Sequence, residues 1–118
     1  MSGSPQLSLV MPAYNEEDDI DLVMERVDDV VRSLGLTYEL IVVDDGSLDN
    51  TRVKVEDYAR NNDHVRVVGY ENNVGKGFAL KTGFSHAGGD VVVFMDSDTD
   101  IDTKLVVRYV EALKDADV

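Results

Sequence analysis

The chain has 118 residues, long enough for one domain with a hydrophobic core. It has no cysteine, which excludes disulfides and cysteine-ligated zinc, and its two histidines argue against a histidine-rich metal site. Twenty-four acidic residues against eleven basic ones give a formal net charge of −13, which disfavours nucleic acid as a partner. The excess of Asp is also typical of a halophile-like acidic surface, because salt screens self-repulsion.

Strands and helices are predicted to alternate along the whole chain. Short apolar runs predict the strands, and apolar residues at helical spacing predict the helices. In chain order, the predicted elements are a strand at 7–11, a helix at 20–34, a strand at 40–43, a helix at 51–59, a strand at 65–68, a helix at 77–87 that carries Leu80, Phe84 and Ala87, a strand at 91–95 and a helix at 102–113. The strands are too uniformly apolar to have a wet face. They indicate an α/β fold with a mostly parallel sheet, order 3-2-1-4, and helices on both faces.

Three unusual clusters follow predicted strands. They are Pro12-Ala13-Tyr14-Asn15-Glu16 after the first strand, Asp44-Asp45-Gly46-Ser47 after the second, and Asp96-Ser97-Asp98-Thr99-Asp100 after the fourth. Ligands of open α/β sheets bind at the carboxyl ends of strands, and strands one and four are neighbours in the predicted order. We therefore expect the first and last clusters to face each other across one crevice, with Asp45 on its flank. Each cluster alone is equally compatible with an ordinary turn or helix start.

The last cluster carries three carboxylates at alternate positions, Asp96, Asp98 and Asp100. Residues two apart in an extended segment project to the same side, so these groups can converge. Carboxylates that close repel one another unless a proton or a cation intervenes, and oxygen ligands suit Mg²⁺ or Mn²⁺. The cluster is therefore a candidate metal site. The alternative is an acidic loop that caps the following helix.

Other residues of these clusters suit a nucleotide. Tyr14 can pack on a nucleobase, Glu16 can accept hydrogen bonds from ribose hydroxyls, and Asp45 can accept the ring N–H of uracil or guanine. The Gly75-Lys76-Gly77 turn offers backbone N–H groups and a cation to phosphate. The patterns GxxxxGK[ST] and GxGxxG are absent, which argues against a P-loop protein and a dinucleotide dehydrogenase.

With these motifs in place, the chain from Leu7 to Val118 resembles the family 2 glycosyltransferases of the GT-A fold, and most closely the dolichyl- or polyprenyl-phosphate hexose synthases. The resemblance implies a Rossmann-like GT-A nucleotide-sugar-binding domain. The motifs that carry it are Val10-Met11-Pro12-Ala13-Tyr14-Asn15-Glu16, Val42-Val43-Asp44-Asp45-Gly46-Ser47-Leu48-Asp49-Asn50-Thr51, Asn73-Val74-Gly75-Lys76-Gly77, and Gly89-Asp90 leading to Asp96-Ser97-Asp98.

The resemblance implies a role for each matching residue. Asp96 and Asp98 would form the DxD motif that holds Mg²⁺ or Mn²⁺ against the donor diphosphate, with Asp98 as the catalytic residue. Asp100 would be a further metal ligand, although many relatives carry Gln there. The residues that would bind the nucleotide sugar are Pro12, Ala13, Tyr14, Glu16, Val43, Asp45, Lys76, Asp96 and Ser97.

The implied reaction is the inverting transfer of glucose or mannose from UDP-glucose or GDP-mannose to dolichyl or polyprenyl phosphate, at the cytoplasmic face of a membrane. A phosphate monoester is already largely a dianion at neutral pH, so it hardly needs a general base. A sugar hydroxyl would need one, and no residue of the chain stands out as that base. Two alternatives stay open. One is a family 2 enzyme that acts on a sugar hydroxyl in cell-surface glycan synthesis, and the other is a receiver-like regulatory domain whose acids hold Mg²⁺.

The expected domain organisation is simple. Residues 1–6 form a disordered or vector-derived tail, and residues 7–118 form the donor-binding domain, cut short at its C-terminus. In the resembled enzymes the acceptor-binding residues, and membrane anchors where present, lie beyond the matching region. We therefore expect the full-length protein to associate with a membrane, and these 118 residues alone to transfer no sugar.

Overall fold

The computed structural model describes residues 5–95. Within them, one parallel sheet contains the strands β1 (Leu7–Ala13), β2 (Tyr38–Asp45), β3 (Val65–Tyr70) and β4 (Val91–Phe94). The connections contain the helices α1 (Ile20–Arg32), α2 (Thr51–Arg60) and α3 (Lys76–His86). The strand order β3-β2-β1-β4 confirms the predicted order 3-2-1-4. The helix predicted at 102–113 lies outside the described residues.

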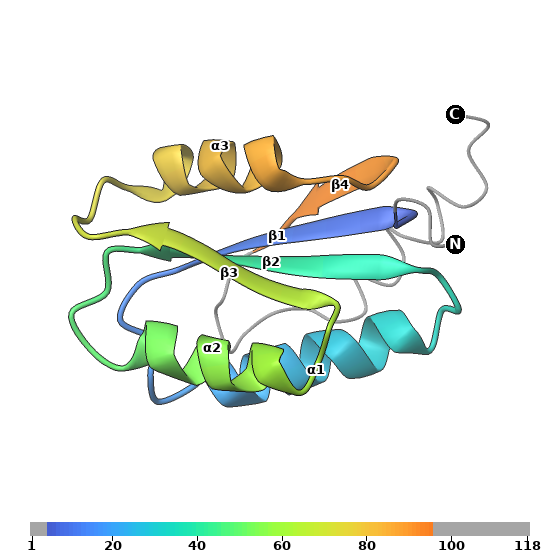
Figure 1. Ribbon diagram of the computed structural model, residues 1–118, viewed down its shortest axis with the longest axis horizontal. Coiled ribbons are helices and arrows are strands. Elements are labelled where there is room, and N and C mark those ends of the chain that lie inside the picture. The colour runs from blue at the N-terminus through green and yellow to red at the C-terminus, as the bar shows by residue number, and fades with distance from the viewer. Residues whose placement is uncertain (1–4, 96–118) are drawn as a thin grey trace.

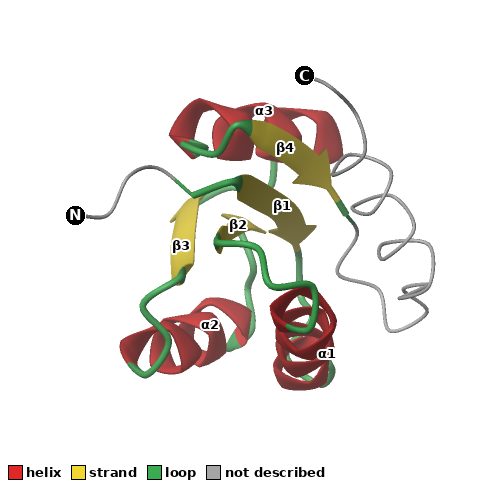
Figure 2. Cartoon of the chain, turned by 90° about the vertical axis from the view of Figure 1, so that its right-hand side faces the viewer, coloured by secondary structure: helices red, strands yellow, loops and turns green. Residues whose placement is uncertain are grey.

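The helices cover both faces of this sheet, as predicted. Figure 1 shows α1 and α2 on one face and α3 on the other, and Figure 2 shows the same layers seen along the strands. Because both faces are covered, the central strands β1 and β2 have no wet side. All seven residues of β1 and the last six of β2 are buried. This burial explains why both strands are nearly continuous apolar runs in the sequence.

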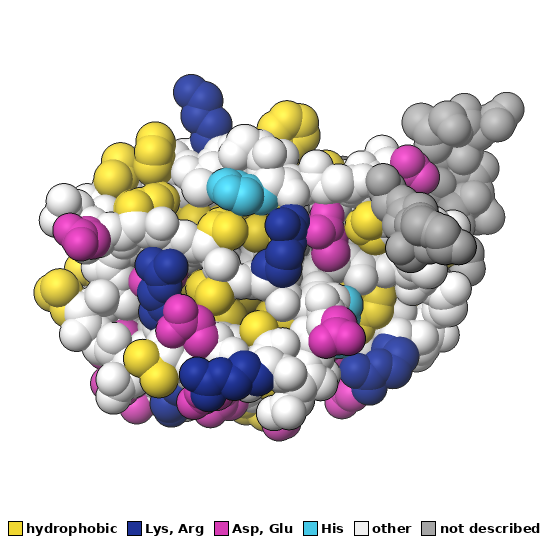
Figure 3. All heavy atoms as spheres, viewed as in Figure 1, with side chains coloured by type: hydrophobic (Ala, Val, Ile, Leu, Met, Phe, Trp, Pro, Cys, Tyr) yellow, Lys and Arg dark blue, Asp and Glu magenta, His cyan; other side chains and the backbone are white. Residues whose placement is uncertain are grey.

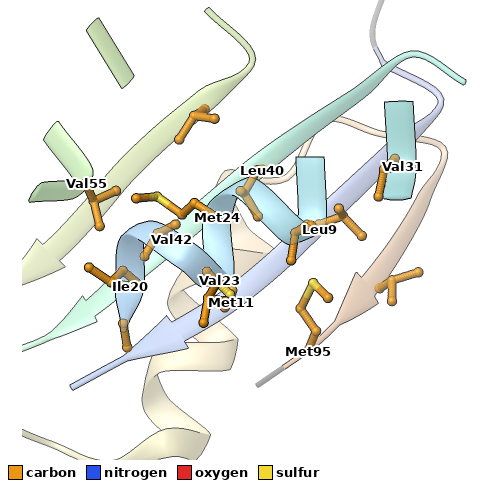
Figure 4. Close-up of a cluster of buried hydrophobic side chains, with 14 of the residues drawn as sticks. Leu9, Met11, Ile20, Val23, Met24, Val31, Leu40, Val42, Val55 and Met95 are labelled. Carbon is orange, nitrogen blue, oxygen red and sulfur yellow. The ribbon is translucent and has the colours of Figure 1, made fainter. Parts of the chain in front are cut away.

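The larger part of the core lies between the sheet and the pair α1 and α2. Apolar residues of α1 recur at three- and four-residue spacing, so they form one stripe that faces the sheet. Figure 4 shows this stripe packed against the side chains of the two central strands. The residues at this contact include Ile20, Val23, Met24 and Val31 of α1, Leu9 and Met11 of β1, and Leu40 and Val42 of β2.

The other face of the sheet packs closely against α3 through small residues. Ala79 is fully buried there beside Val10 and Val43. A Cβ atom on Gly83 would lie 2.2 Å from Val10 Cγ1 and 3.0 Å from Val43 Cγ2. Phe84, one of the apolar residues on the predicted helix, is 58% exposed in α3. Its ring lies 6.3 Å from the ring of Phe94 of β4, which is itself 48% exposed.

The first strand extends through a proline. The sequence predicted an end at Met11, but β1 continues to Ala13 and pairs there with β2. Val10 accepts a hydrogen bond from Met95 N–H on the β4 side, and residue 12 faces the same side because backbone directions alternate. The β1–β4 register ends at the pair Val10 and Phe94. Pro12 therefore lacks its N–H on the side of β1 that faces β4, beyond the last described pair of these two strands.

A buried carboxylate joins the secondary-structure elements at the amino ends of the strands. Asp28 of α1 is 1% exposed and accepts hydrogen bonds from the hydroxyl groups of Tyr38 (3.0 Å) and Tyr58. His64 Nε2 lies 2.8 Å from the same carboxylate. The cluster links α1, β2, α2 and the residue before β3. No sequence motif points to Asp28, because an acid inside an apolar helical stripe gives no local sign of its partners.

A second polar cluster fixes the turn between α3 and β4. Glu39 of β2 accepts hydrogen bonds from Ser8 Oγ, from Gly88 N–H at 2.7 Å and from Arg66 Nη2 at 3.0 Å. Gly89 N–H donates in turn to Ser8 Oγ at 2.8 Å. Burial alone would raise the pKa of Glu39, but these donors outweigh it and hold the pKa below its ordinary value.

The surface over α2 and β3 carries charges of both signs. Figure 3 shows acidic and basic side chains lying next to each other on this side of the molecule. Within α2, Arg52 pairs with Glu56 and Arg60 pairs with Asp57. Exposed pairs of this kind contribute at most about 1 kcal/mol each.

The first prediction concerns the contact of α3 with the sheet. Gly83→Ala should lower the free energy of unfolding by about 1–2 kcal/mol, because the new methyl group overlaps the buried side chain of Val10, and this cost exceeds the gain from removing a helical glycine. Urea unfolding monitored by circular dichroism measures the difference. Gly77→Ala is the matched control, because a Cβ there meets no atom within 4 Å. It should be neutral or stabilise by up to about 1 kcal/mol. Equal effects of the two variants would contradict the packing described here.

The second prediction concerns pH. Folding lowers the pKa of Glu39, so its ionised carboxylate adds to the free energy of unfolding. This stabilisation is complete above the unfolded-state pKa of about 4.3 and is lost as the pH falls through the folded-state pKa. Glu39→Gln should therefore cost about 1–2 kcal/mol at pH 7, and the difference from the unsubstituted chain should shrink below about pH 4. Asp57→Asn removes an exposed acid instead and should cost less than about 1 kcal/mol. Urea unfolding between pH 3 and 7 tests both; a cost for Glu39→Gln that does not change with pH would contradict the assignment.

Candidate functional site

The loops that follow β1, β2 and β3 meet at one edge of the sheet, because the strands are parallel and end on the same side. This edge is the left end of the sheet in Figure 1. The N–H of Met95, the last described residue, donates to Val10 O at 3.0 Å, which places the residue after β4 beside β1. The predicted metal and nucleotide residues Asp96, Ser97, Asp98 and Asp100 follow Met95 and lie outside the described residues.

The loops after β1 and β2 are joined by hydrogen bonds. Asn15 N–H donates to Ser47 Oγ at 2.9 Å, and Leu48 N–H donates to Asn15 Oδ1 at 2.8 Å. Glu16 N–H donates to Thr51 Oγ1 at 2.8 Å. Asn15 has a φ of 51°, a left-handed conformation that asparagine tolerates better than most residues. These bonds hold the backbone on both sides of Asn15, and so the positions from which Tyr14 and Glu16 project.

Asp49 extends the same connection. Its carboxylate accepts hydrogen bonds from Thr51 N–H at 2.9 Å and from Glu17 N–H at 3.3 Å. Burial alone would raise the pKa of Asp49, but the hydroxyl and N–H donors outweigh it and lower the pKa from its ordinary value. Lys54 Nζ also donates to Glu17 O at 2.6 Å. The loop after β1 is therefore fixed from α2 as well as from the loop after β2.

Asp45 connects the end of β2 to the turn before α3. Its Oδ1 accepts hydrogen bonds from Tyr70 OH at 2.7 Å and from Val74 N–H at 3.0 Å. Its Oδ2 accepts from Asn73 Nδ2 at 2.8 Å and from Gly75 N–H at 3.0 Å. Burial alone would raise the pKa of Asp45, but these donors outweigh it, so the pKa is lowered and the group is ionised at neutral pH.

Gly46 allows the loops after β2 and β3 to touch through their backbones. It has a φ of +70°, and a Cβ atom there would lie 2.4 Å from the carbonyl carbon of Asn72 and from the nitrogen of Asn73. Both observations require glycine. The sequence motif Asp44-Asp45-Gly46-Ser47 is thus more than an ordinary turn, because each of its residues after Asp44 contacts another loop.

The structure brings the predicted site residues of the described range to this one edge. Pro12, Ala13 and Val43 are buried at the ends of their strands, Tyr14 is 40% exposed, and Lys76 is exposed at the first position of α3. Their roles toward a ligand stay predictions. Tyr70 and Asn73 were not predicted as partners of Asp45. Asn73 stands in the motif Asn73-Val74-Gly75-Lys76-Gly77 and Tyr70 follows the predicted third strand, but neither position points to Asp45.

All three predicted metal ligands lie outside the part of the chain that the structure describes. Residues 5–95 contain no group of three or more Asp, Glu or His side chains that could hold a metal ion. The predicted ligands begin at Asp96, so the prediction neither gains nor loses support from the geometry of this range. None of the helices α1, α2 and α3 is long and apolar enough to cross a membrane.

Comparison with known proteins gives a consistent result. The sequence profile of the family described as glycosyl transferase family 2 matches residues 8–118. An uncharacterized glycosyltransferase of Synechocystis is 36% identical over 106 residues, which cover 90% of this chain and 33% of that protein. An undecaprenyl-phosphate 4-deoxy-4-formamido-L-arabinose transferase of Klebsiella pneumoniae is 35% identical over 107 residues, with the same coverage of 90% and 33%. The chain thus spans about a third of the length of these curated relatives.

Solved structures resemble the whole fold. The glucosyl-3-phosphoglycerate synthase of Mycobacterium tuberculosis, in complex with Mn²⁺, UDP and phosphoglyceric acid, superposes with a TM-score of 0.76 at 34% identity over 96% of this chain and 40% of its own. A mannosyltransferase of Pyrobaculum calidifontis, in complex with GDP-Man and Mn²⁺, gives 0.71 at 28% identity over 99% of this chain and 34% of its own. These matches confirm the predicted GT-A fold.

The family profile spans all four motifs that carried the resemblance, and it excludes the receiver-like alternative. The sequence, the strand order and the neighbouring structures therefore agree: this chain belongs to glycosyl transferase family 2.

Proposed function

We propose that the chain is the donor-binding part of a metal-dependent, inverting glycosyltransferase that transfers glucose or mannose from a nucleoside diphosphate sugar to dolichyl or polyprenyl phosphate. The observation that carries the proposal is the joined set of loops at the carboxyl edge of β1 and β2, in a chain whose family motifs continue directly into Asp96-Ser97-Asp98.

The donor is proposed from the side chains at this edge. Tyr14 offers a partly exposed ring to a nucleobase, and Glu16 offers a carboxylate to ribose hydroxyls. Val43 and Asp45 lie at the end of β2, and Lys76 begins α3 where a diphosphate would need a cation. UDP or GDP-Man occupies two of the similar solved structures, which supports a nucleoside diphosphate sugar as the ligand class.

The metal is proposed from the chemistry of its donor set. Asp96 and Asp98 would hold Mg²⁺ or Mn²⁺, with Asp100 as a further ligand, because carboxylate oxygens suit these hard cations. Both similar structures contain Mn²⁺. A bound divalent cation would stabilise the negative charge that develops on the leaving diphosphate. The remaining contribution of the chain is to orient the donor through Tyr14, Glu16 and Lys76.

The acceptor is proposed from its charge and from a relative. A phosphate monoester is mostly dianionic at neutral pH and needs no general base. An undecaprenyl-phosphate sugar transferase is among the relatives, which supports a lipid phosphate over a sugar hydroxyl. Because a polyprenyl chain stays in the bilayer, we place the full-length protein at the cytoplasmic face of a membrane.

Asp98→Asn should lower the affinity for UDP or GDP in the presence of Mn²⁺ at least about tenfold, because one carboxylate ligand of the metal is lost. Isothermal titration calorimetry at fixed ionic strength, with Mn²⁺ and with EDTA, measures the effect. Asp90→Asn is the matched control: it makes the same charge change at the exposed residue before β4, at the opposite end of that strand. It should leave binding within about twofold. Nucleotide binding that is equally strong in EDTA would contradict metal dependence.

The proposed acceptor is tested with the full-length protein. Incubated with radiolabelled UDP-glucose or GDP-mannose and Mn²⁺, it should label polyprenyl phosphate and not polyprenol, because only the former carries the dianion that attacks without a general base. Thin-layer chromatography of the lipid extract measures the product. Label that appears only in a water-soluble glycan acceptor would favour the sugar-hydroxyl alternative.

A further inference from the structure

Asn15 has an unusual backbone conformation at the carboxyl edge of the sheet. Its φ of 51° is the only positive φ of a non-glycine residue in residues 5–95. Residues other than glycine rarely adopt this left-handed region, and they stay there only where surrounding contacts hold them. Asn15 lies between Tyr14, which is 40% exposed, and Glu16. The contacts that hold Asn15 therefore decide how the backbone presents both of these neighbours.

Those contacts come from the loop after β2. Asn15 donates its N–H to Ser47 Oγ at 2.9 Å and accepts Leu48 N–H on its Oδ1 at 2.8 Å. We call these two bonds the Asn15 clamp. One bond starts from the backbone of Asn15 and the other from its side chain, and they reach two consecutive residues. A change in the backbone conformation of Asn15 would therefore displace the donor and the acceptor together.

The clamp is anchored in buried parts of the fold. Ser47 N–H donates to Asp44 Oδ1 at 3.2 Å, and Asp44 is only 3% exposed at the end of β2. On the other side of the left-handed residue, Glu16 N–H donates at 2.8 Å to Oγ1 of Thr51, which is fully buried at the first position of α2. The turn at Asn15 is thus held from β2 and from α2, and not by its own loop alone.

Asparagine meets both requirements of this position. Glycine adopts a positive φ readily but has no side chain to accept Leu48 N–H. Alanine lacks the acceptor and disfavours the left-handed region as well. Aspartate keeps an acceptor oxygen and tolerates this region, but it adds a charge. Substitution of Asn15 by these three residues therefore separates the backbone requirement from the hydrogen-bond requirement.

We propose that Asn15 is a positioning residue of the donor site: its clamp to Ser47 and Leu48 holds the left-handed turn that presents Tyr14 and Glu16 to the nucleoside part of the donor. This inference rests on the proposed function, in which Tyr14 and Glu16 bind that part. Loss of the clamp should therefore weaken the contacts to base and ribose. The contacts of the metal and of Lys76 to the diphosphate do not depend on the turn.

The experiment compares nucleotides with inorganic pyrophosphate, which lacks the nucleoside. Calorimetry with Mn²⁺ measures the affinities of UDP, GDP and pyrophosphate for the unsubstituted chain and for Asn15→Gly, Asn15→Ala and Asn15→Asp. Dividing each nucleotide affinity by the pyrophosphate affinity removes effects on the metal and on net charge. We expect this ratio to fall about tenfold in Asn15→Gly, at least as far in Asn15→Ala, and to stay within about threefold in Asn15→Asp. An unchanged ratio in Asn15→Gly, or an equal fall in Asn15→Asp, would overturn the proposal.

The other end of the clamp gives an independent variant. Ser47→Ala removes the acceptor of Asn15 N–H, so it should lower the same ratio by a smaller factor, and Ser47→Thr, which keeps the hydroxyl, should restore it. If Asn15→Gly does not fold, these two variants carry the test.

Gln6→Ala is the matched control. Gln6 and Thr37 make a reciprocal connection of the same kind at the opposite end of the sheet: Gln6 Oε1 accepts Thr37 N–H and Gln6 N–H donates to Thr37 Oγ1, both at 3.0 Å. Loss of this connection should lower thermal stability slightly and leave the affinity ratio within about twofold. A fall in the ratio as large as that of Asn15→Gly would show that the effect is not specific to the clamp, and would overturn the proposal.

Hydrogen exchange tests the clamp in the absence of any nucleotide. In Asn15→Gly, the amide hydrogen of Leu48 should exchange at least tenfold faster than the change in global stability explains, because its acceptor is gone. In Asn15→Asp it should exchange as slowly as in the unsubstituted chain. Unchanged exchange in Asn15→Gly would overturn the positioning role even if nucleotides bind. Faster exchange in a chain that binds none of the nucleotides would instead refute the donor site and leave the clamp as part of the fold.

Discussion

The constraint on which this structure depends is the complete burial of its two central strands. Every residue of β1, and β2 from Leu40 to Asp45, is removed from water, including Ser8, Asp44 and Asp45. A buried polar group without a partner costs about 1–3 kcal/mol, and more if it is charged. Accordingly, no buried polar side-chain atom in residues 5–95 lacks a hydrogen bond. The polar residues of these strands therefore use their hydrogen bonds to hold the neighbouring segments in place.

These hydrogen bonds hold different segments at the two ends of the sheet. At the amino ends, Ser8 and Glu39 hold the turn before β4, and Asp28 holds α1 against α2 and β2. At the carboxyl ends, the loops after β1, β2 and β3 are held to one another through Asn15, Gly46 and Asp45. The contacts at the carboxyl ends fix the backbone next to Tyr14 and leave the Tyr14 side chain exposed. A ligand edge built in this way is ordered by loop-to-loop bonds and not by the strands alone.

The sequence predicted what depends on local pattern and missed what depends on distant partners. Apolar runs and helical spacing located all seven described elements, and the burial of both central strands explains why those runs were so clear. Phe84 helped to predict α3 but is exposed there, because an apolar side chain is buried only where the packing leaves room for it. Beneath α3 the side chains of Val10 and Val43 come so close to the helix that small residues, Ala79 and Gly83, are buried at this contact. The partners of Asp45 lie 25–30 residues away along the chain, so no local pattern pointed to them. The roles of Asp96, Asp98 and Asp100 remain predictions.

The charges at the carboxyl edge of the sheet would repel an anionic donor that approaches without a cation. Asp45 and Asp49 both have lowered pKa values, so each carries its full negative charge at neutral pH. The donors that lower these pKa values are hydroxyl, amide and backbone N–H groups, which stabilise a carboxylate without cancelling its charge. A diphosphate approaching this edge therefore meets fixed anions, on a chain whose net charge is already −13. Repulsion of this kind falls with salt but persists at short range, within about 8 Å at physiological ionic strength. The hydrogen bonds that order the loops thus keep negative charge at this edge, and the divalent cation proposed at the carboxylates after β4 would act with Lys76 to offset it.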